Sequence, residues 1–362
     1  MNVLLAAGGT GGHLFPAAAL ASALKARGVE VDLATDDRAL KYGGDFPARR
    51  VYRIPSATPT RAGMIAKAQA TAMLGLGVVS ALRLLMRLKP AAVIGFGGYP
   101  TVPPLFAASL LGVPTILHEQ NAVLGRANRF LSRRVTCIAC GFPEPGGVAP
   151  GLRAKLRYTG NPVRPAVLKA AETPYPDFAD GKLRVLVTGG SQGARVMSEV
   201  VPAALAKLSP EERTRIVLTL QARGEDRAQA SADCAKLGFH AEIAEFFPDL
   251  PARIAAAHLV VARAGASTVS ELAVIGRPSI LVPYPHALDQ DQAANAALLA
   301  RDGAATVIRQ SDFTPERLAA TWRAALADPE ALDLKAAAAR RVGVVDAAER
   351  LATLAAEIAG AK

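Results

Sequence analysis

The residues best suited to chemistry in the first part of this 362-residue sequence are a run of glycines and a histidine, Gly8-Gly-Thr-Gly-Gly-His13. The run follows the apolar segment 3–7, which is typical of a buried strand, and precedes an apolar helical pattern from about Phe15 to Arg27. The backbone N–H groups of such a turn and the positive end of the helix behind it favour an anion such as a phosphate. His13 lies where the turn enters the helix, so we expect its imidazole to face the same space.

Two further groups of polar or glycine residues follow predicted strands in the first half. Gly95-Phe-Gly-Gly-Tyr99 closes the strand 92–95, and His118-Glu-Gln-Asn121 closes the strand 115–118. The carboxyl ends of parallel strands lie at one edge of a sheet, so these segments should lie near the glycine run. Glu119 beside His118 is either an acid/base pair or a structural hydrogen-bond set.

The second half repeats the strand–glycine turn–helix pattern. The strand Leu183–Thr188 leads into Gly189-Gly-Ser-Gln-Gly-Ala-Arg195, and a later strand leads into Arg263-Ala-Gly-Ala-Ser-Thr-Val-Ser-Glu271. The hydroxyl residues of the latter segment suit a helix N-terminus that holds a phosphate. Glu271, which we place in the first turn, either accepts hydrogen bonds from a ribose or compensates the helix dipole.

Other ligand classes fit these motifs poorly. A dinucleotide-binding G-x-G-x-x-G from Gly9 would need glycine where Leu14 stands, although Asp32 could imitate the ribose-binding acid, and no P-loop lysine follows. A tight turn without a ligand is the plain alternative. Asp289-Gln-Asp291 opens an Ala-rich helix instead of following a strand, so we predict no metal site there. Cys137 and Cys140 lie in an apolar run and read as core strand residues, and three cysteines in all suit a reducing compartment.

The order of strands and helices predicts an α/β fold with two Rossmann-like domains. We place the first at 1–160 and the second at 161–339, with a helix at about 340–362 that could pack back on the first. The boundary follows the proline- and glycine-rich segment Gly160-Asn-Pro-Val-Arg-Pro165 and the loose segment after it. Two tandem α/β domains imply a ligand cleft between them.

The net charge of +11 is uneven. Residues 1–160 contain 19 Lys and Arg against 7 Asp and Glu, whereas residues 161–362 contain 23 against 24. The first half should therefore meet an anionic partner. Residues 61–89 mix apolar side chains with Lys and Arg, and Arg126, Arg129 and Arg133 recur at helical spacing. This favours an anionic membrane surface, and the scarcity of interleaved aromatic residues argues against nucleic acid. We expect neither a signal peptide nor a membrane-spanning stretch.

Taken together and in order, the six motifs resemble the MurG family of bacterial N-acetylglucosaminyltransferases, which make lipid II from lipid I. The motifs are Gly8 to His13, Gly95 to Tyr99, His118 to Asn121, Gly160 to Arg164, Gly189 to Arg195 and Arg263 to Glu271. The resemblance implies a GT-B fold, in which two Rossmann-like domains with parallel sheets face each other across a cleft.

The resemblance also implies the reaction. N-acetylglucosamine passes from UDP-GlcNAc to the C4 hydroxyl of MurNAc in undecaprenyl-pyrophosphoryl-MurNAc-pentapeptide, with inversion and without a cofactor or bound metal. It places the chain peripherally on the cytoplasmic face of the bacterial inner membrane, as part of peptidoglycan synthesis, beside cell-wall and division proteins.

The roles that the resemblance implies fall into three sets. For UDP-GlcNAc they are Thr10, Gly11, Gly12, Asn121, Arg164, Ser191, Phe247, Ala266, Ser267, Thr268, Val269, Ser270, Glu271 and Gln292. For the acceptor pyrophosphate they are Gly8, Gly9, Gly97, Gly98 and Tyr99. His13 is the first candidate for the general base and Glu119 the second, because a base must take the acceptor proton near neutral pH.

Three other functions compete with this one. They are a GT-B transferase for a different lipid or small-molecule acceptor, a Rossmann oxidoreductase, and a non-catalytic membrane scaffold. The repeated glycine turns and the polar strand ends in both halves disfavour the last two.

Overall fold

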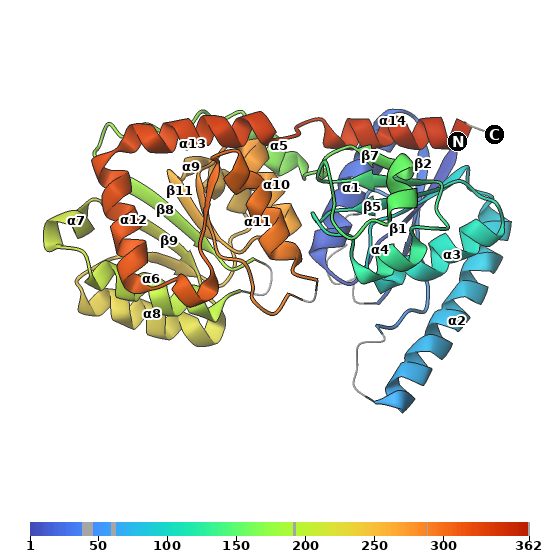
Figure 1. Cartoon of the computed structure of the whole chain (residues 1–362), viewed down its shortest axis with the longest axis horizontal. Coiled ribbons are helices and arrows are strands. Elements are labelled where there is room, and N and C mark those ends of the chain that lie inside the picture. The colour runs from blue at the N-terminus through green and yellow to red at the C-terminus, as the bar shows by residue number, and fades with distance from the viewer. Residues whose placement is uncertain (38–45, 59–62, 191–192, 288, 361–362) are drawn as a thin grey trace. The chain divides into compact units, whose positions relative to one another are not determined.

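The structure, a computed structural model, describes residues 1–37, 46–58, 63–190, 193–287 and 289–360. The chain divides into two compact units, one of residues 1–164 with 345–362 and one of residues 165–344. Each unit is an α/β fold built on a parallel sheet, which confirms the predicted fold class (Figure 1).

Unit 1, residues 1–164 with 345–362, contains a seven-stranded sheet of order β3-β2-β1-β4-β5-β6-β7. The strands are β1 (Asn2–Ala6), β2 (Glu30–Thr35), β3 (Arg50–Arg53), β4 (Ala92–Gly95), β5 (Thr115–Glu119), β6 (Cys137–Cys140) and β7 (Leu156–Tyr158). The helices are α1 (Gly11–Ala26), α2 (Met64–Leu88), α3 (Val102–Leu110), α4 (Arg126–Leu131) and α14 (Ala347–Gly360), with short 3₁₀ turns η2 (Tyr99–Thr101) and η3 (Pro150–Lys155).

The sheet of unit 1 is buried on both faces, as the near-continuous apolar sequence of β1 requires. Val3 and Leu5 join the core under α1 and α14, while Leu4 and Ala6 join the core under α2, α3 and α4. This alternation follows from the two-residue period of a strand. Cys137 and Cys140 are buried in β6, which confirms their reading as core residues.

Helix α14 completes the core of unit 1, although it comes last in the sequence. Leu351 and Leu354 lie in one cluster with Leu20 and Leu24 of α1. Beside this cluster, the Arg27 guanidinium donates to the Glu349 carboxylate at 3.2 Å. The predicted helix at 340–362 is in fact the end of one helix and the whole of another, because the helix before α14 stops at Val342.

Unit 2, residues 165–344, contains a six-stranded sheet of order β10-β9-β8-β11-β12-β13. The strands are β8 (Leu183–Thr188), β9 (Ile216–Gln221), β10 (Glu242–Ala244), β11 (Leu259–Ala262), β12 (Ser279–Leu281) and β13 (Ala305–Val307). The helices are α5 (Pro165–Ala171), α6 (Arg195–Ala206), α7 (Pro210–Thr214), α8 (Gly224–Lys236), α9 (Leu250–Ala256), α10 (Ala266–Ile275), α11 (Asp291–Arg301), α12 (Pro315–Ala327) and α13 (Pro329–Val342), with a 3₁₀ turn η4 (Gln310–Asp312).

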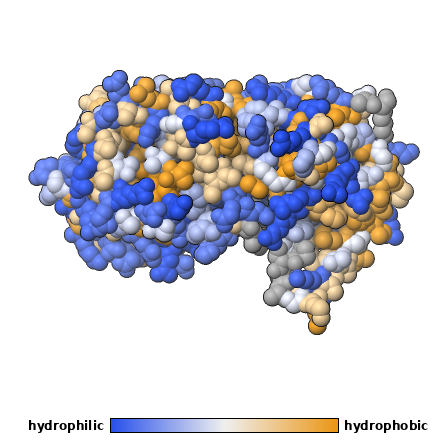
Figure 2. All heavy atoms as spheres, in the orientation of Figure 1, coloured by the Kyte–Doolittle hydropathy of each residue, from blue (hydrophilic) through white to orange (hydrophobic). Residues whose placement is uncertain are grey.

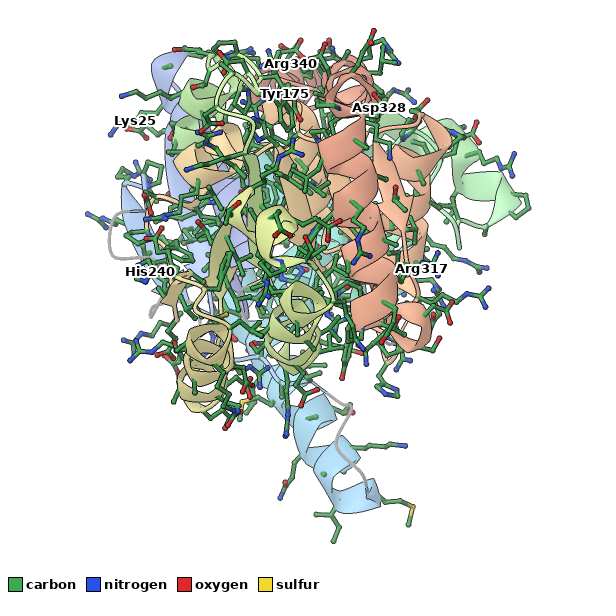
Figure 3. All side chains as sticks on the ribbon, turned by 90° about the vertical axis from the view of Figure 1, so that its left-hand side faces the viewer. Lys25, Tyr175, His240, Arg317, Asp328 and Arg340 are labelled. Carbon is green, nitrogen blue, oxygen red and sulfur yellow. The ribbon has the colours of Figure 1, made fainter. Side chains whose placement is uncertain are left out.

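The segment after α5, predicted to be loose, is fixed against the amino-terminal end of this sheet. The buried Arg277 guanidinium donates to the carbonyls of Thr173 at 3.2 Å and Pro174 at 2.9 Å. The Tyr175 hydroxyl donates to the His258 carbonyl at 2.9 Å, and the His258 ring stacks on Phe178 at 3.8 Å between centroids. Tyr175 and Arg340 are labelled at this end of the unit (Figure 3).

Helix α2 has two different halves. Its second half packs on α3 and buries Gly77, Ala81, Leu84 and Leu85. Its first half projects away from the rest of unit 1 in both ribbon views (Figures 1 and 3). By length and composition, α2 is the one helix in the described ranges that could cross a membrane, but the same test admits core helices of soluble proteins.

Gly77 is the position where α2 comes closest to its neighbours. A Cβ there would fall 2.1 Å from the Pro55 carbonyl oxygen and 2.9 Å from Pro103, whereas a Cβ on Gly75, one half-turn away and exposed, would meet nothing within 4 Å. The absence of a side chain at Gly77 therefore sets the distance between α2 and α3.

We predict opposite effects for alanine at these two glycines. Gly77→Ala should lower the thermal midpoint, because the backbone must move to admit the methyl group. Gly75→Ala should leave the thermal midpoint unchanged or raise it, because alanine at an exposed helix position is more stable than glycine by about 1 kcal/mol. Differential scanning calorimetry of both variants measures this. Equal midpoints would show that the contact at Gly77 does not fix α2.

Candidate active site

Each sheet has one place where the strand order reverses, and in parallel α/β sheets ligands bind outside the strand ends at that place. In unit 1 it lies between β1 and β4, where the loops 7–10 and 96–98 leave the sheet. In unit 2 it lies between β8 and β11, where the segments after Thr188 and Ala262 leave it. These are the four glycine-containing segments that the sequence singles out.

In unit 1 the two glycine loops contact each other. A Cβ on Gly98 would lie 3.3 Å from the Cε1 atom of His13, and a Cβ on Gly8 would lie 2.9 Å from Pro100. Gly9 and Gly98 both have positive φ, +84° and +73°, which residues with a side chain rarely adopt. The first turn of α1 carries no acidic residue and no side-chain cap, so its N–H groups suit an anion.

His13 is half-buried at the start of α1, with its ring held by the loop before it. Its Nδ1 lies 3.2 Å from the Gly8 carbonyl oxygen. A carbonyl oxygen only accepts, so this hydrogen bond requires the proton on Nδ1 and leaves the lone pair on Nε2. Burial lowers the pKa of His13, while the hydrogen bond to Gly8 and the charge of Asp36 oppose that fall. The hydrogen bond and the lowered pKa thus favour a neutral ring with its lone pair on Nε2.

Glu119 has a different environment, at the end of β5. It is 1% exposed, and both carboxylate oxygens accept hydrogen bonds. The donors are the Asn121 amide at 2.9 Å, the Gly125 amide at 2.8 Å and the Asn128 side chain at 2.7 Å. Burial raises the pKa of Glu119, and these donors oppose the rise. The geometry favours a role in shaping the loop 120–125, so His13 is the better placed of the two base candidates.

His118 is a buried structural residue of the same strand end. Its Nε2 donates to the Gly160 carbonyl at 3.2 Å, and its Nδ1 accepts from the Gln120 side-chain amide at 3.1 Å. The Asn161 side chain donates to the Gln120 carbonyl at 2.9 Å. Burial lowers the pKa of His118 to about 4. This neutral histidine joins β5 to the segment 160–164, which the sequence treats as a linker.

The same segment brings Arg164 to the first turns of α1. Its guanidinium lies 4.8 Å from the centre of the Phe15 ring, a cation–π contact. Asn121 is held by the Glu119 carboxylate through its backbone and side-chain amides. The structure therefore gathers His13, Asn121 and Arg164 around the carboxyl ends of β1, β4 and β5.

In unit 2 the residues expected to hold the donor phosphates form the start of α10. The helix begins at Ala266 after Gly265, and its first turn carries no acidic residue. Ser267, Thr268 and Ser270 are half-buried. The Val269 side chain lies wholly in the core, and its amide donates to the Gly265 carbonyl at 3.0 Å, so Val269 offers neither group to a phosphate. Glu271 lies in the second turn, not in the first as predicted, because α10 starts at Ala266.

Gln292 and Arg263 hold the loops around α10. The Gln292 side-chain oxygen accepts from the amides of Tyr284 at 3.0 Å and Ala264 at 3.3 Å. Arg263 donates to the Val282 carbonyl at 3.0 Å and to the Gln310 side chain at 2.6 Å. Sequence reasoning treated Arg263 only as part of a motif and missed Gln310, since only the tertiary fold brings η4 to this loop.

Ser191 and Phe247 are both predicted to contact UDP-GlcNAc, but the structure shows neither of them at an accessible site. Ser191 lies outside the described residues. The Phe247 ring is 5% exposed and lies under the Arg253 guanidinium at 4.3 Å, while its neighbour Phe246 is 71% exposed. Burial of Phe247 limits its reach to a base, and Phe246 is the ring that the sequence analysis did not consider.

Two acidic residues, Asp32 and Asp36, have partners that could not be predicted from the sequence. Asp32, weighed as a ribose-binding acid, is buried in mid-strand and paired with Arg49 at 2.7 Å. Asp36, which follows β2, accepts from the Gly9 amide at 3.1 Å. Its position one residue past a strand adjacent to β1 was the available signal. In the ranges that the structure describes, no group of three or more His, Cys, Asp or Glu could hold a metal ion.

Comparisons with known proteins agree on one family. Residues 3–140 match the glycosyltransferase family 28 N-terminal domain, and residues 184–351 match the C-terminal domain of the same family. The chain is 60% identical over 359 residues to a UDP-N-acetylglucosamine–N-acetylmuramyl-(pentapeptide) pyrophosphoryl-undecaprenol N-acetylglucosamine transferase of Methylobacterium sp. (strain 4-46), covering 99% of this chain and 96% of that protein. The chain belongs to the MurG family.

Further relatives support this membership. A transferase with the same description from Methylobacterium nodulans is 59% identical, over 99% of this chain and 96% of that protein. The crystal structure of Acinetobacter baumannii MurG matches with a TM-score of 0.78 and 30% identity, covering 98% of each chain. The chain is thus a glycosyltransferase with the GT-B fold that the MurG resemblance implied.

The buried histidine of β5 predicts a pH dependence of stability. The pKa of His118 is about 4 in the folded state and 6.5 in a model peptide, so the unfolded chain binds a proton that the folded chain does not. Stability should therefore fall as pH drops from 6.5 to 4, by about 3 kcal/mol from this residue. Thermal unfolding of wild type and His118→Gln across this pH range measures the effect. The raised pKa of Glu119 acts in the opposite direction, and subtracting the His118→Gln values from those of wild type removes its contribution.

The matched control is His240→Gln, which removes an exposed histidine in unit 2 (Figure 3). It should keep the wild-type pH dependence. If His118→Gln showed the same slope as wild type, His118 would not be the buried group that resists protonation.

Proposed function

We propose a mechanism by which this chain catalyses the reaction of its family, and a membrane surface on which it acts. It is a transferase that moves N-acetylglucosamine from UDP-GlcNAc to the lipid-linked MurNAc-pentapeptide, lipid I, and so forms lipid II for peptidoglycan synthesis. The hydrogen bond from His13 Nδ1 to Gly8 carries the mechanistic proposal, because it leaves Nε2 as the proton acceptor. The high identity over 99% of the chain disfavours a GT-B transferase for another acceptor.

His13 is the general base of this mechanism. Its Nε2 takes the proton of the MurNAc C4 hydroxyl as that oxygen attacks C1 of the donor sugar from the face opposite to UDP, which inverts C1. The lowered pKa of His13 keeps the ring neutral at pH 7, as a base must be. Gly8, Gly9 and loop 97–99 line the pyrophosphate of the acceptor beside the base, and Thr10 to Gly12 serve UDP-GlcNAc. The Gly9 N–H itself donates to Asp36, so the other N–H groups of these loops hold the pyrophosphate.

The leaving UDP needs its developing charge stabilised without a metal ion. The first turn of α10 supplies the N–H groups of Ala266, Ser267 and Thr268 for the phosphates. The Val269 amide already donates to the Gly265 carbonyl at 3.0 Å, and Glu271 accepts from the ribose hydroxyls. The family resemblance also implies Arg164, Asn121 and Gln292 as residues that bind UDP-GlcNAc, with Phe247 or its exposed neighbour Phe246 near the uracil. Addition of EDTA should therefore leave the transfer rate unchanged.

We predict that His13→Gln loses turnover but not donor binding. The kcat for transfer of radiolabelled sugar from UDP-GlcNAc to a lipid I analogue should fall by about a hundredfold or more, because the general base is gone. The dissociation constant for UDP, measured by calorimetry, should change less than about twofold, because His13 contacts neither phosphate nor ribose of the donor in this proposal. Turnover at the wild-type rate would remove His13 as the base.

The membrane surface is the second part of the proposal. Apolar side chains on α2 are exposed, Met64 at 87%, Ile65 at 78% and Leu76 at 62%. Leu110 and Phe130, on α3 and α4, are exposed at 56% and 58%, and apolar residues gather over α2 and α3 in the space-filling view (Figure 2). Arg133 and Arg134 are exposed next to them, and Arg134 lies over Phe106.

This combination of apolar side chains and arginines suits an anionic bilayer surface. We therefore place the chain peripherally on the cytoplasmic face of the inner membrane, where lipid I would be within reach of unit 1. The excess of positive charge in residues 1–160 supports this side of the molecule as the one that meets lipid. Contacts with cell-wall and division proteins would also form there.

We predict that Leu76→Glu weakens binding to phosphatidylglycerol-containing vesicles by about tenfold or more in a flotation assay, because burial of a leucine contributes about 1.5–3 kcal/mol. The matched control is Leu334→Glu on α13, since Leu334 is equally exposed at 66%. Wild-type binding should also weaken in high salt. Equal losses in the two variants would show that α2 is not the membrane contact.

A further inference from the structure

The peptide group between Gly8 and Gly9 lies between a carboxylate and the imidazole of His13. Its N–H end, on Gly9, donates to Oδ1 of Asp36 at 3.1 Å. Its C=O end, on Gly8, accepts from Nδ1 of His13 at 3.2 Å. The N–H and C=O belong to one planar unit, so a single peptide connects Asp36 to His13.

We propose that Asp36 is a positioning residue that supports His13 as a proton acceptor through the Gly8–Gly9 peptide. This inference rests on the proposed role of His13 as the base. A carboxylate at the N–H end draws the peptide towards its charge-separated resonance form and puts more negative charge on the carbonyl oxygen. Hydrogen bonds in such a chain strengthen each other, and the more negative oxygen stabilises the imidazolium more than the neutral ring.

The fold holds both ends of this chain of hydrogen bonds. Strands β1 and β2 pair in parallel with Ala6 opposite Ala34, and the Ala7 amide continues the ladder to the Ala34 carbonyl at 3.2 Å. The register places the residues after β2 beside the loop after β1. Asp36 is 7% exposed there, so its charge acts in a medium that screens it weakly.

Gly8 must lack a side chain for this approach. A Cβ on Gly8 would lie 2.8 Å from Oδ1 of Asp36 and 2.9 Å from Cβ of Pro100, so the carboxylate occupies the space that a side chain would take. Gly9 turns the peptide with φ of +84°. The two glycines therefore serve the Asp36 contact as well as the approach of an anionic ligand.

Asp36 is the charged group that acts on His13 among the described residues, and it raises the pKa of the imidazole against the lowering effect of burial. The other described neighbours of the ring carry no charge: they are Gly98 and the Thr10 hydroxyl, which lies 3.4 Å from Nδ1. The Gly8 carbonyl raises the pKa of His13 as well. Loss of the Asp36 charge should thus lower the pKa of His13 and make it a weaker base.

The neighbouring Asp37 provides a matched control. It also follows β2 and carries the same charge, but it is 80% exposed and pairs with Arg53 at 3.2 Å. Asp36→Asn removes one negative charge while keeping an oxygen that can accept from Gly9. Asp37→Asn removes one negative charge from the adjacent position without touching the peptide.

The experiment is an NMR titration of the His13 ring, labelled with ¹⁵N, in wild type, Asp36→Asn and Asp37→Asn. We expect the pKa of His13 to fall by about one unit in Asp36→Asn and to stay unchanged in Asp37→Asn. The acid limb of the pH profile of kcat/KM should move to lower pH by the same amount in Asp36→Asn only. The kcat on the plateau should fall about threefold to tenfold, because a weaker base removes the proton more slowly.

Each outcome bears on a distinct claim. Equal pKa values of His13 in the two variants, or a proton on Nε2 instead of Nδ1 in the wild-type ¹⁵N spectrum, would overturn the proposal for Asp36. A lowered pKa of His13 without a shift of the acid limb would keep the Asp36 contact but remove His13 as the base. If Asp36→Asn failed to fold, Asp36→Ser and the wild-type tautomer would decide instead.

Discussion

The direction of the strands is the constraint on which both candidate sites depend. Every strand of each sheet is parallel to its neighbours, so the carboxyl ends of the strands open on one edge and the loops that follow them are forced together. In unit 1 this puts the residues after β1, β2, β4 and β5 within contact of each other although they are far apart in sequence. The chemistry then depends on what short loops can hold: two glycine turns, a histidine, and the carboxylates of Asp36 and Glu119.

Two buried carboxylates organise this edge in the same manner. Glu119 gathers the amides of Asn121 and Gly125 with the Asn128 side chain, and Asp36 takes the Gly9 amide. Each carboxylate is withdrawn from water and accepts hydrogen bonds from backbone that has no ladder partner, which offsets the free-energy cost of burial. These hydrogen bonds hold the two loops in place, which lowers the ordering cost for any ligand that binds there.

The features that could be predicted from the sequence are those that depend on residues close together along the chain. Glycine turns after apolar runs mark strand ends, so the segments at Gly8, Gly97, Gly189 and Gly265 were recognisable, and so was the α/β class. The edge strands β3 and β7 were not, because Arg50–Arg53 and Leu156–Tyr158 are short and largely exposed, without an apolar run. The contacts of Asp36 and Gln310 depend on tertiary packing, which no local pattern records. The same holds for Glu119, because only the folded loop shows that both of its carboxylate oxygens accept hydrogen bonds.

The packing of α14 on α1 has a consequence for how the chain is made. Most of unit 1 is translated before unit 2, yet four residues of its core are translated only after all of unit 2, namely Leu351, Ala352, Leu354 and Ala355. Until then the part of this core that α14 covers, beside Leu20 and Leu24 of α1, is exposed. Unit 2, residues 165–344, is one continuous segment and can finish folding first. The first domain in the sequence is thus the last to complete its core during synthesis, and a fragment that stops at residue 164 would expose that side of α1 to aggregation.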